Sequence, residues 1–212
     1  IESDGNCKEW EESGGCPIHK CTREHNVPFC GLCGDFPCEW VVKKTVWRDN
    51  YVEEHRRLAS EYYMRNIRRA EISDAHRIAE ILVFNYRLNF YPIFQNDEYY
   101  FEEMTVDNIA EKIRNSDFLN KTFVYDDAVV KGFIKINGNE IEKLFVEPVL
   151  QGQGIGKKLL CYAVHNCGAV QLWVLEKNSR ATAFYQRNGF YITDEKKPEE
   201  DTDEYLVLMK KA

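Results

Sequence analysis

Apolar and polar residues recur along the chain with two different periods, and these periods predict its elements. Apolar residues at three- and four-residue spacing over Ala75–Val83 predict an amphipathic helix, which Ser73 or Asp74 caps and which ends near Asn89. Alternating or continuous apolar runs predict strands. In chain order the predicted elements are strand IRRAEI (67–72), that helix, helix Thr105–Arg114, strands KTFVYDD, AVVKGFIKING and NEIEKLFVEP, helix GIGKKLLCYAVHN, strand AVQLWVLE, helix NSRATAFYQRN, and strands GFYIT and DEYLVLMKK.

The order of these elements predicts an α/β (α+β) fold. The turn pairs DD and NG join the three central strands, so we expect an antiparallel meander there. The acidic stretch DEKKPEEDTDE before the last strand is predicted to be a solvated connection.

Cysteine usage separates the front of the chain from this pattern. Six of the 8 cysteines lie between Cys7 and Cys38, in a stretch rich in Gly, Pro and Glu with few long aliphatic residues. A charged, aromatic-containing segment, Thr45–Met64, then reads as a helix. We therefore predict a Cys-rich module over 1–44, a connecting helix over 45–65 and a larger domain over 66–212.

Charge and hydropathy exclude some classes of protein. The formal net charge of -7 disfavours nucleic-acid binding, which usually needs a basic stripe. No apolar run approaches the roughly 20 residues that span a bilayer, and no signal peptide is visible. We expect no nucleic-acid or membrane partner and a cytoplasmic location, while the oligomeric state stays open and a dimer is compatible with the sequence.

Three glycines at alternate positions separate a strand from a helix in LFVEPVLQGQGIGKKLL. A dinucleotide fingerprint, GxGxxG, would need glycine where the chain has Lys157, and a P-loop would need a hydroxyl residue where it has Lys158. Glycines before a helix start nevertheless let amide groups approach an anion, and the helix dipole favours one there. The alternative is a plain strand-to-helix turn.

This stretch resembles the fingerprint of the GNAT superfamily of acetyl-CoA-dependent N-acetyltransferases. A strand ending in LxV precedes Q/R-x-x-G-x-G/A in that family, and a second motif follows downstream in VLEKNSRATAFYQRNGF. The resemblance covers about Ile67–Lys211 and implies a mixed central sheet flanked by helices, with acetyl-CoA as cosubstrate. The residues it implies for coenzyme binding are Leu144, Phe145, Val146, Gln151, Gly152, Gln153, Gly154, Ile155, Gly156, Lys157, Asn178 and Tyr185.

The same resemblance implies catalytic roles for three side chains. Tyr185 stands where the family has its general acid, and the alternative is a core aromatic residue. Glu142 and Glu140 are candidates for the base that deprotonates the amine, directly or through water. Strict alternation would put both glutamates on one face of their strand with Leu144 and Val146; the alternative is that both are solvated. Backbone N–H near Leu144 would polarise the thioester carbonyl.

The amine acceptor is a small molecule or a peptide that the sequence does not identify. In the family, the segment that corresponds to Phe84–Phe101 forms one wall of the acceptor site, and its aromatic and acidic residues could hold a cationic or hydrophobic amine. The alternative is that these aromatic rings pack in the hydrophobic core. A rival interpretation of the whole chain is a coenzyme-A-sensing regulatory protein whose Cys-rich module recognises a partner.

The front module resembles a Cys-rich prokaryotic domain of unknown function that ends in C-x-x-C-x-x-F-P-C, here Cys30 to Cys38. A CxxC pair among other cysteines is a pattern typical of zinc sites. The candidate ligands are Cys16, Cys21, Cys30, Cys33 and Cys38. Reduced structural thiols and disulfides are the alternatives, whereas Cys161 and Cys167 are predicted to be helix packing residues.

Overall fold

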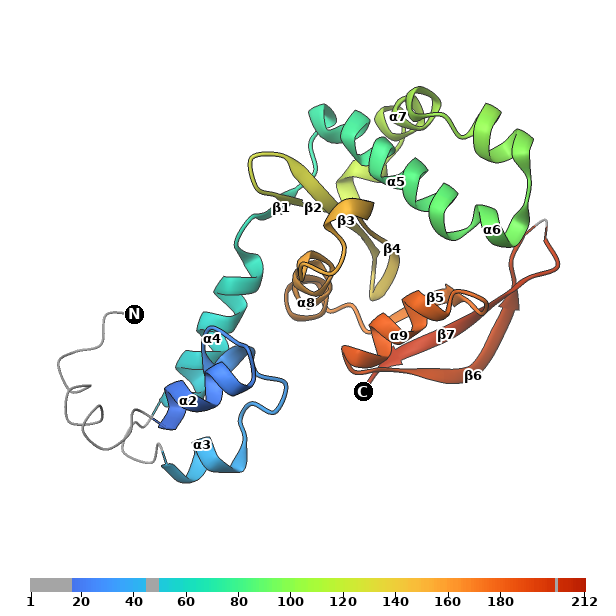
Figure 1. Cartoon of the computed structure of the whole chain (residues 1–212). Helices are drawn as coiled ribbons and strands as arrows, with labels where there is room; N and C mark the ends of the chain where they lie inside the picture. The colour runs from blue at the N-terminus through green and yellow to red at the C-terminus, as the bar shows by residue number, and fades with distance from the viewer. Residues whose placement is uncertain (1–16, 45–49, 201) are drawn as a thin grey trace. The chain divides into compact units, whose positions relative to one another are not determined.

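The structure is a computed structural model that describes residues 17–44, 50–200 and 202–212. The chain divides into two compact units, Ile1–Tyr62 and Tyr63–Ala212 (Figure 1). The boundaries predicted at residues 44 and 65 stay predictions, because the helix α4 (Tyr51–Met64) runs through the point of division. No helix among the described residues combines the length and apolar character that a membrane span requires.

The described part of the first unit is helical. It contains α2 (Pro17–Glu24), the 3₁₀ turn η1 (Cys30–Leu32), α3 (Glu39–Lys44) and most of α4. Its buried cluster consists of Cys30, Val41 and Tyr51, with Phe36, Cys38 and Val52 packed around it. This is a small apolar core for a module that forms its own compact unit.

The second unit is built on a mixed seven-stranded sheet in the order β1-β2-β3-β4-β5-β7-β6. The strands are β1 (Ile67–Arg69), β2 (Thr122–Asp126), β3 (Val130–Asn137), β4 (Glu140–Val146), β5 (Gln171–Leu175), β6 (Phe190–Pro198) and β7 (Tyr205–Lys211). Strands β1 to β4 form the predicted antiparallel meander, and the pairing of β4 with β5 is parallel. The mixed sheet expected from the resemblance is therefore confirmed.

Helices cover the sheet on both faces (Figure 1). Helices α5 (Ala75–Asn89) and α7 (Val106–Arg114) pack over one face, in a cluster that includes Ile78 and Phe133. Helices α8 (Ile155–Cys167) and α9 (Ser179–Arg187) pack in the cluster on the other face, which includes Leu159 and Tyr185. Between α5 and α7 lie the short helix α6 (Tyr91–Phe94) and the π-helical turn η3 (Glu98–Glu103).

Two sequence predictions differ from the observed strands. The predicted strand over 67–72 is too long, because Ile72 already begins the 3₁₀ turn η2 (Ile72–Asp74). The acidic stretch after residue 193 is not simply a loop: β6 continues to Pro198 and pairs with β7 beyond a register shift, as Lys196↔Val207 and Pro198↔Tyr205. Hydrogen bonding to a neighbouring strand thus overrides the polar composition of this segment.

The side chains of β4 do not alternate strictly between the two faces of the sheet, contrary to the sequence prediction. Its register with β3 shifts by one residue, because Lys143 pairs with Lys135 but Ile141 pairs with Ile136. Glu142 is the extra residue of this β-bulge. Ile141 consequently lies in the same core cluster as Val146 rather than on the opposite face, so the prediction that Glu140 and Glu142 share a face with Leu144 and Val146 is wrong.

Candidate active site

Strands β4 and β5 separate after their first residues. Their parallel pairing covers only Glu140↔Gln171 and Ile141↔Leu172. From Glu142 to Val146 the β5-side edge of β4 has no strand partner in the part of the chain that the structure describes. An unpaired strand edge in the middle of a sheet offers main-chain donors and acceptors to an extended ligand.

The glycine turn follows directly at the open end of β4. After the 3₁₀ turn η5 (Pro148–Leu150), Gly152 and Gly154 both have φ of +82°, a left-handed conformation that favours glycine. A Cβ built on either residue meets no atom within 4 Å, so the space beside both is open. The α8 N–H of Lys158 donates to the Gly154 carbonyl at 3.0 Å, which leaves the amides of the preceding turn outside the helix ladder.

The other predicted residues of this turn divide between packing and surface. Ile155 is buried as the first residue of α8, and Gly156 lies against the ring of Phe184 in α9. Gln153 and Lys157 are exposed beside the helix start. The turn therefore combines a fixed backbone, a helix N-terminus and a lysine, which together suit an anionic ligand.

Asn85 is a site residue that the sequence interpretation missed. It is 1% exposed on α5, and its side-chain amide donates to the carbonyls of Ile81 (2.7 Å) and Val146 (3.0 Å). Its Oδ1 accepts from Gln151 Nε2 at 3.0 Å, and Gln151 also donates to the Val146 carbonyl at 3.2 Å. Asn85 thus ties the end of β4 to the start of the glycine turn. A buried asparagine on the apolar side of a predicted helix was the available signal.

Tyr185 lies on α9 within the cluster that also holds Val146 and Leu172, one from each of the separating strands. Its side chain is 8% exposed, and burial raises the pKa of the phenol far above its ordinary value. No described residue hydrogen-bonds its hydroxyl, and no fully buried side-chain oxygen or nitrogen among the described residues lacks a partner. The phenol therefore stays protonated at neutral pH.

Glu140 and Glu142 lie near the point where β4 stops pairing with β5. Glu140 lies in the last residue pairs that join β4 to β5, and Glu142 is the first residue beyond them. Glu142 forms an ion pair with Lys135. Burial alone would raise the pKa of Glu142, but the hydrogen bond and charge of Lys135, with a hydrogen bond from Asn137, hold it below its ordinary value. Glu142 is therefore an ionised carboxylate with a defined orientation.

The remaining predicted coenzyme residues also have structural contacts. Leu144 packs against the same core cluster as Val146, whereas Phe145 packs against the cluster on the opposite face. Asn178 caps α9, since its Oδ1 accepts from the Ala181 N–H at 3.1 Å. None of these contacts excludes a role of the backbone in binding.

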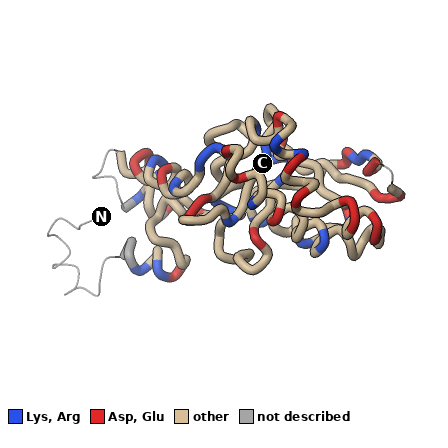
Figure 2. The backbone as a smooth tube through the Cα atoms, turned by 90° about the horizontal axis from the view of Figure 1, so that it is seen from above, with Lys and Arg blue, Asp and Glu red and all other residues tan. Residues whose placement is uncertain are grey.

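Aromatic and acidic groups lie near one another on the side of the unit where α6 is drawn beside the β6–β7 connection (Figure 1). Burial and the charges of Glu103 and Glu199 raise the pKa of Tyr99, which is 40% exposed. Lys143 of β4 donates to the Tyr86 hydroxyl at 2.9 Å and is also within electrostatic reach of Tyr99. Acidic residues concentrate at this end of the unit (Figure 2). Part of the segment Phe84–Phe101 thus faces a charged surface instead of filling the core.

Four of the five predicted metal ligands lie around one small cavity in the first unit. Cys21, Cys30, Cys33 and Cys38 line it, and all four are free thiols. The fifth candidate, Cys16, lies outside the described residues. The structure therefore brings together cysteines from α2, from η1 and from the start of α3.

Two protein families match this chain, one within each of its two compact units. Residues 119–192 match the acetyltransferase (GNAT) domain family, and residues 2–43 match a family described as protein of unknown function (DUF3795). Among curated relatives, the peptidyl-lysine N-acetyltransferase YjaB of Salmonella typhimurium is 35% identical over 37% of this chain and 57% of its own length. The peptidyl-lysine N-acetyltransferase YiaC of Escherichia coli is 37% identical over 32% and 48%. The chain spans about half the length of these relatives.

Solved structures share the fold of the second unit. The apo-form solution structure of Escherichia coli YjaB has a TM-score of 0.54 and 21% identity, covering 68% of this chain and 95% of that one. The crystal structure of PaiA N-acetyltransferase from Thermoplasma acidophilum in complex with coenzyme A has a TM-score of 0.51 and 24% identity, covering 68% and 97%. The second unit therefore has the same overall fold as these proteins.

Proposed function

Because residues 119–192 match the acetyltransferase (GNAT) domain family, we propose that the chain transfers the acetyl group of acetyl-CoA to a primary amine by direct attack in a ternary complex. The observation that carries this proposal is the open β5-side edge of β4, which ends at the glycine turn before α8. The first feature suits the extended arm of the coenzyme and the second its diphosphate. PaiA N-acetyltransferase, which has the same fold, was solved in complex with coenzyme A, and this supports coenzyme A as the ligand.

The diphosphate is assigned to the amides between Gln151 and Gly156, with Lys157 adding positive charge at the rim. The pantetheine arm is assigned to the free edge of β4 near Leu144 and Phe145, where main-chain groups would bind it like an added strand. The Val146 carbonyl already accepts two side-chain hydrogen bonds, so the arm would use the other groups of this edge. Asn178 stays a candidate for further contacts with the coenzyme.

The reaction forms one C–N bond and breaks one C–S bond. The neutral amine attacks the thioester carbon while a β4 amide near Leu144 stabilises the developing oxyanion. Collapse of the tetrahedral intermediate releases the coenzyme thiolate, which takes a proton from the Tyr185 hydroxyl. The new amide nitrogen gives up one proton, so the phenol is restored and no net proton change remains in this step.

A base must first deprotonate the amine, because a lysine-like amine has a pKa of about 10.4. Glu142 is the preferred candidate: it is ionised, oriented by Lys135 and placed just beyond the last β4–β5 pair. Its lowered pKa makes it a weak base, so relay through water suits it better than direct abstraction. Glu140 remains the second candidate.

The proposed acceptor is the ε-amine of a lysine in a peptide. YjaB and YiaC are named for that activity, which supports it by relationship. The carboxylates of Glu103 and Glu199 beside Tyr99 support it by chemistry, because a negative surface lined with rings attracts an alkylammonium group.

The test combines calorimetry with a thiol-release assay on the full chain. Acetyl-CoA should bind, and an Nα-blocked peptide with one lysine should release thiol and gain an acetyl group on its ε-amine. The matched control is the same peptide with norleucine in place of lysine, which should release none. Absence of acetyl-CoA binding would refute the proposal, and binding without turnover on any amine would favour the coenzyme-sensing alternative.

A further inference from the structure

The first unit holds a cluster of thiols that acetyl transfer does not use. Cys21 comes from α2, Cys30 from η1, Cys33 from the residue that follows η1, and Cys38 from the residue before α3. These four residues line one cavity of about 10 Å³. A cavity of that size holds about one water-sized particle.

The local structure fixes the CxxC segment in place. The N–H of Cys33 donates to the Cys30 carbonyl at 2.9 Å, which closes the turn between the two thiols. A Cβ on Gly31 would collide with the backbone carbonyl of His55 in α4, so this position requires glycine. The two sulfurs are therefore presented by a turn that packs directly on a helix.

Two further side chains approach the sulfurs. Tyr51 hydrogen-bonds the Cys30 thiol, and His25 Nδ1 lies 3.3 Å from Cys33 Sγ. Around a bound cation such partners would orient thiolates and reduce their negative charge. Both contacts suit a site with four anionic sulfurs.

From this arrangement we propose that Cys21, Cys30, Cys33 and Cys38 hold one structural zinc ion as four thiolates. Zinc prefers tetrahedral sulfur and nitrogen ligands, and a closed four-cysteine set leaves no position for a substrate. The ion would add to a small apolar core, whose buried apolar residues in the described part of this unit are Cys30, Leu32, Val41, Tyr51 and Ala59.

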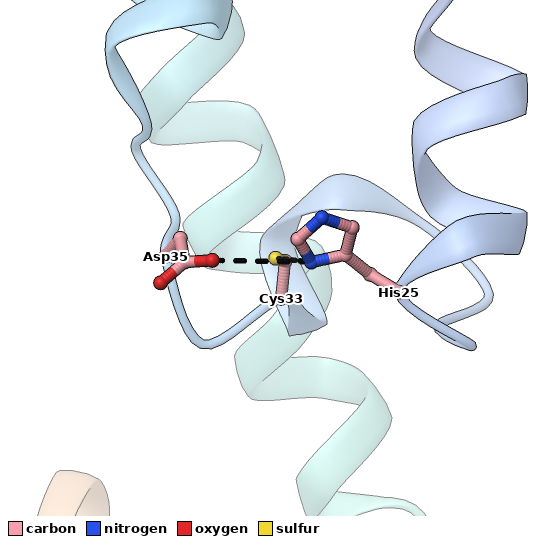
Figure 3. A group of neighbouring side chains, drawn as sticks. All are labelled: His25, Cys33 and Asp35. Carbon is pink, nitrogen blue, oxygen red and sulfur yellow. Dashed lines mark hydrogen bonds and ion pairs between the residues drawn. The ribbon is translucent and has the colours of Figure 1, made fainter.

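A second ligand set on the same surface is the main competitor. His25 lines the same cavity as the four cysteines. Among the described residues, His25, Cys33 and Asp35 are the one set whose ligand atoms all lie within 4.8 Å of one another (Figure 3). The four sulfurs are more widely spaced, so an ion in the cavity would have to draw them together. The side chains of His25 and Asp35 are 43% and 75% exposed, and neither is held by a buried environment. We therefore assign His25 as a hydrogen-bond donor to Cys33 rather than as a ligand.

The experiment uses the full chain purified under reducing conditions with zinc in the growth medium. Elemental analysis after exhaustive dialysis should give one zinc per chain, and X-ray absorption at the zinc edge should give four sulfur neighbours at about 2.3 Å. Cobalt substitution should produce the intense visible bands of a tetrahedral thiolate site. A metal-free protein, or a disulfide between any two of the four cysteines in this preparation, would overturn the proposal.

Variants separate the two ligand sets. Cys21→Ser and Cys38→Ser should lose the ion or weaken its retention at least tenfold, whereas the matched variants Cys161→Ser and Cys167→Ser should retain it. His25→Ala should keep a full zinc equivalent with an unchanged four-sulfur spectrum. A parent spectrum with nitrogen in the first shell, or zinc loss in His25→Ala, would instead assign His25 as a ligand and refute the four-thiolate site.

Discussion

At the scale of single residues, Tyr185 has the properties that an acid for a departing thiolate requires. Burial raises the pKa of its phenol and so keeps a proton available for the thiolate. We expect Tyr185→Phe to lower kcat by about 10²-fold, in the range of general acid catalysis. Calorimetry should give an acetyl-CoA Kd within about twofold of the parent, because the ring still packs against Phe184 and Phe190. Parent-like turnover across the pH range would remove Tyr185 from the mechanism.

The same pKa shift predicts a feature of the parent enzyme's pH profile. A free phenol ionises near pH 10, and the raised pKa of Tyr185 moves its ionisation to higher pH. Tyr185 therefore should cause no loss of kcat on the alkaline side below about pH 10. A descending limb below that pH that disappears in Tyr185→Phe would contradict this assignment.

Glu142 offers a second test, in which the effect of the substitution should be largest near neutral pH and smaller at alkaline pH. Since its pKa is lowered, Glu142 is ionised well below neutral pH and can act throughout the range where the amine is protonated. We expect Glu142→Gln to lower kcat/KM about tenfold or more near pH 7. The deficit should shrink as the pH approaches about 10.4, where the amine loses its proton unaided.

Glu140→Gln is the matched control, because Glu140 lies two residues away on the same strand, within the paired end of β4. It should retain near-parent kcat/KM at every pH. A larger deficit in this variant than in Glu142→Gln would transfer the base to Glu140.

At the scale of elements, the glycine turn joins conformation to binding. Gly154→Ala adds a Cβ to a left-handed residue, at a cost of about 1 kcal/mol, and directs it into the open space assigned to the diphosphate. Gly138→Ala is a suitable control, since Gly138 is also left-handed with open space around it but lies in the β3–β4 hairpin. Both variants should lose similar thermal stability, and only Gly154→Ala should raise the acetyl-CoA Kd, by about tenfold. Equal Kd changes would refute the diphosphate assignment.

Asn85 holds the start of the glycine turn in place through hydrogen bonds with Val146 and Gln151, so its substitution should also affect coenzyme binding. Replacing its amide in Asn85→Leu leaves Gln151 and the Val146 carbonyl without their shared partner, which costs about 1–3 kcal/mol. We expect weaker acetyl-CoA binding together with a lower Tm. Asn89→Ala is the control on the same helix, because within the described residues its side chain donates only to the carbonyl and Oδ1 of Asn85 and does not reach Gln151 or Val146. If Asn85→Leu lost stability with an unchanged Kd, its role would be restricted to packing.

The elements differ in how far sequence could predict them. Helix α5 and the meander follow from local periodicity and turn residues, so the prediction agrees with the structure there. The bulge at Glu142 depends on register with β3, and the extension of β6 depends on pairing with β7. Both are tertiary effects that one strand's pattern does not contain. The contact of Asn85 with Val146 and Gln151 likewise joins segments more than 60 residues apart.

For the whole molecule, the division into two units predicts that two ligands act separately. Zinc binding would stabilise the first unit, Ile1–Tyr62, and acetyl-CoA would stabilise the second, Tyr63–Ala212. Ligation free energy in small zinc modules is on the order of 10–16 kcal/mol and becomes folding free energy. The small apolar core in the described part of the first unit makes a large dependence on the ion reasonable.

Hydrogen exchange with peptide-level mass spectrometry can measure this separation in the intact chain. A chelator should increase exchange over residues 17–44 at least tenfold and leave β3, β4 and α8 unchanged, because those elements belong to the other compact unit. Acetyl-CoA should slow exchange around α8 and leave residues 17–44 unchanged. Zinc added back should restore the parent pattern, which controls for direct effects of the chelator. Loss of protection in both units on chelation would show that they fold as one, and the ion would then support the active site itself.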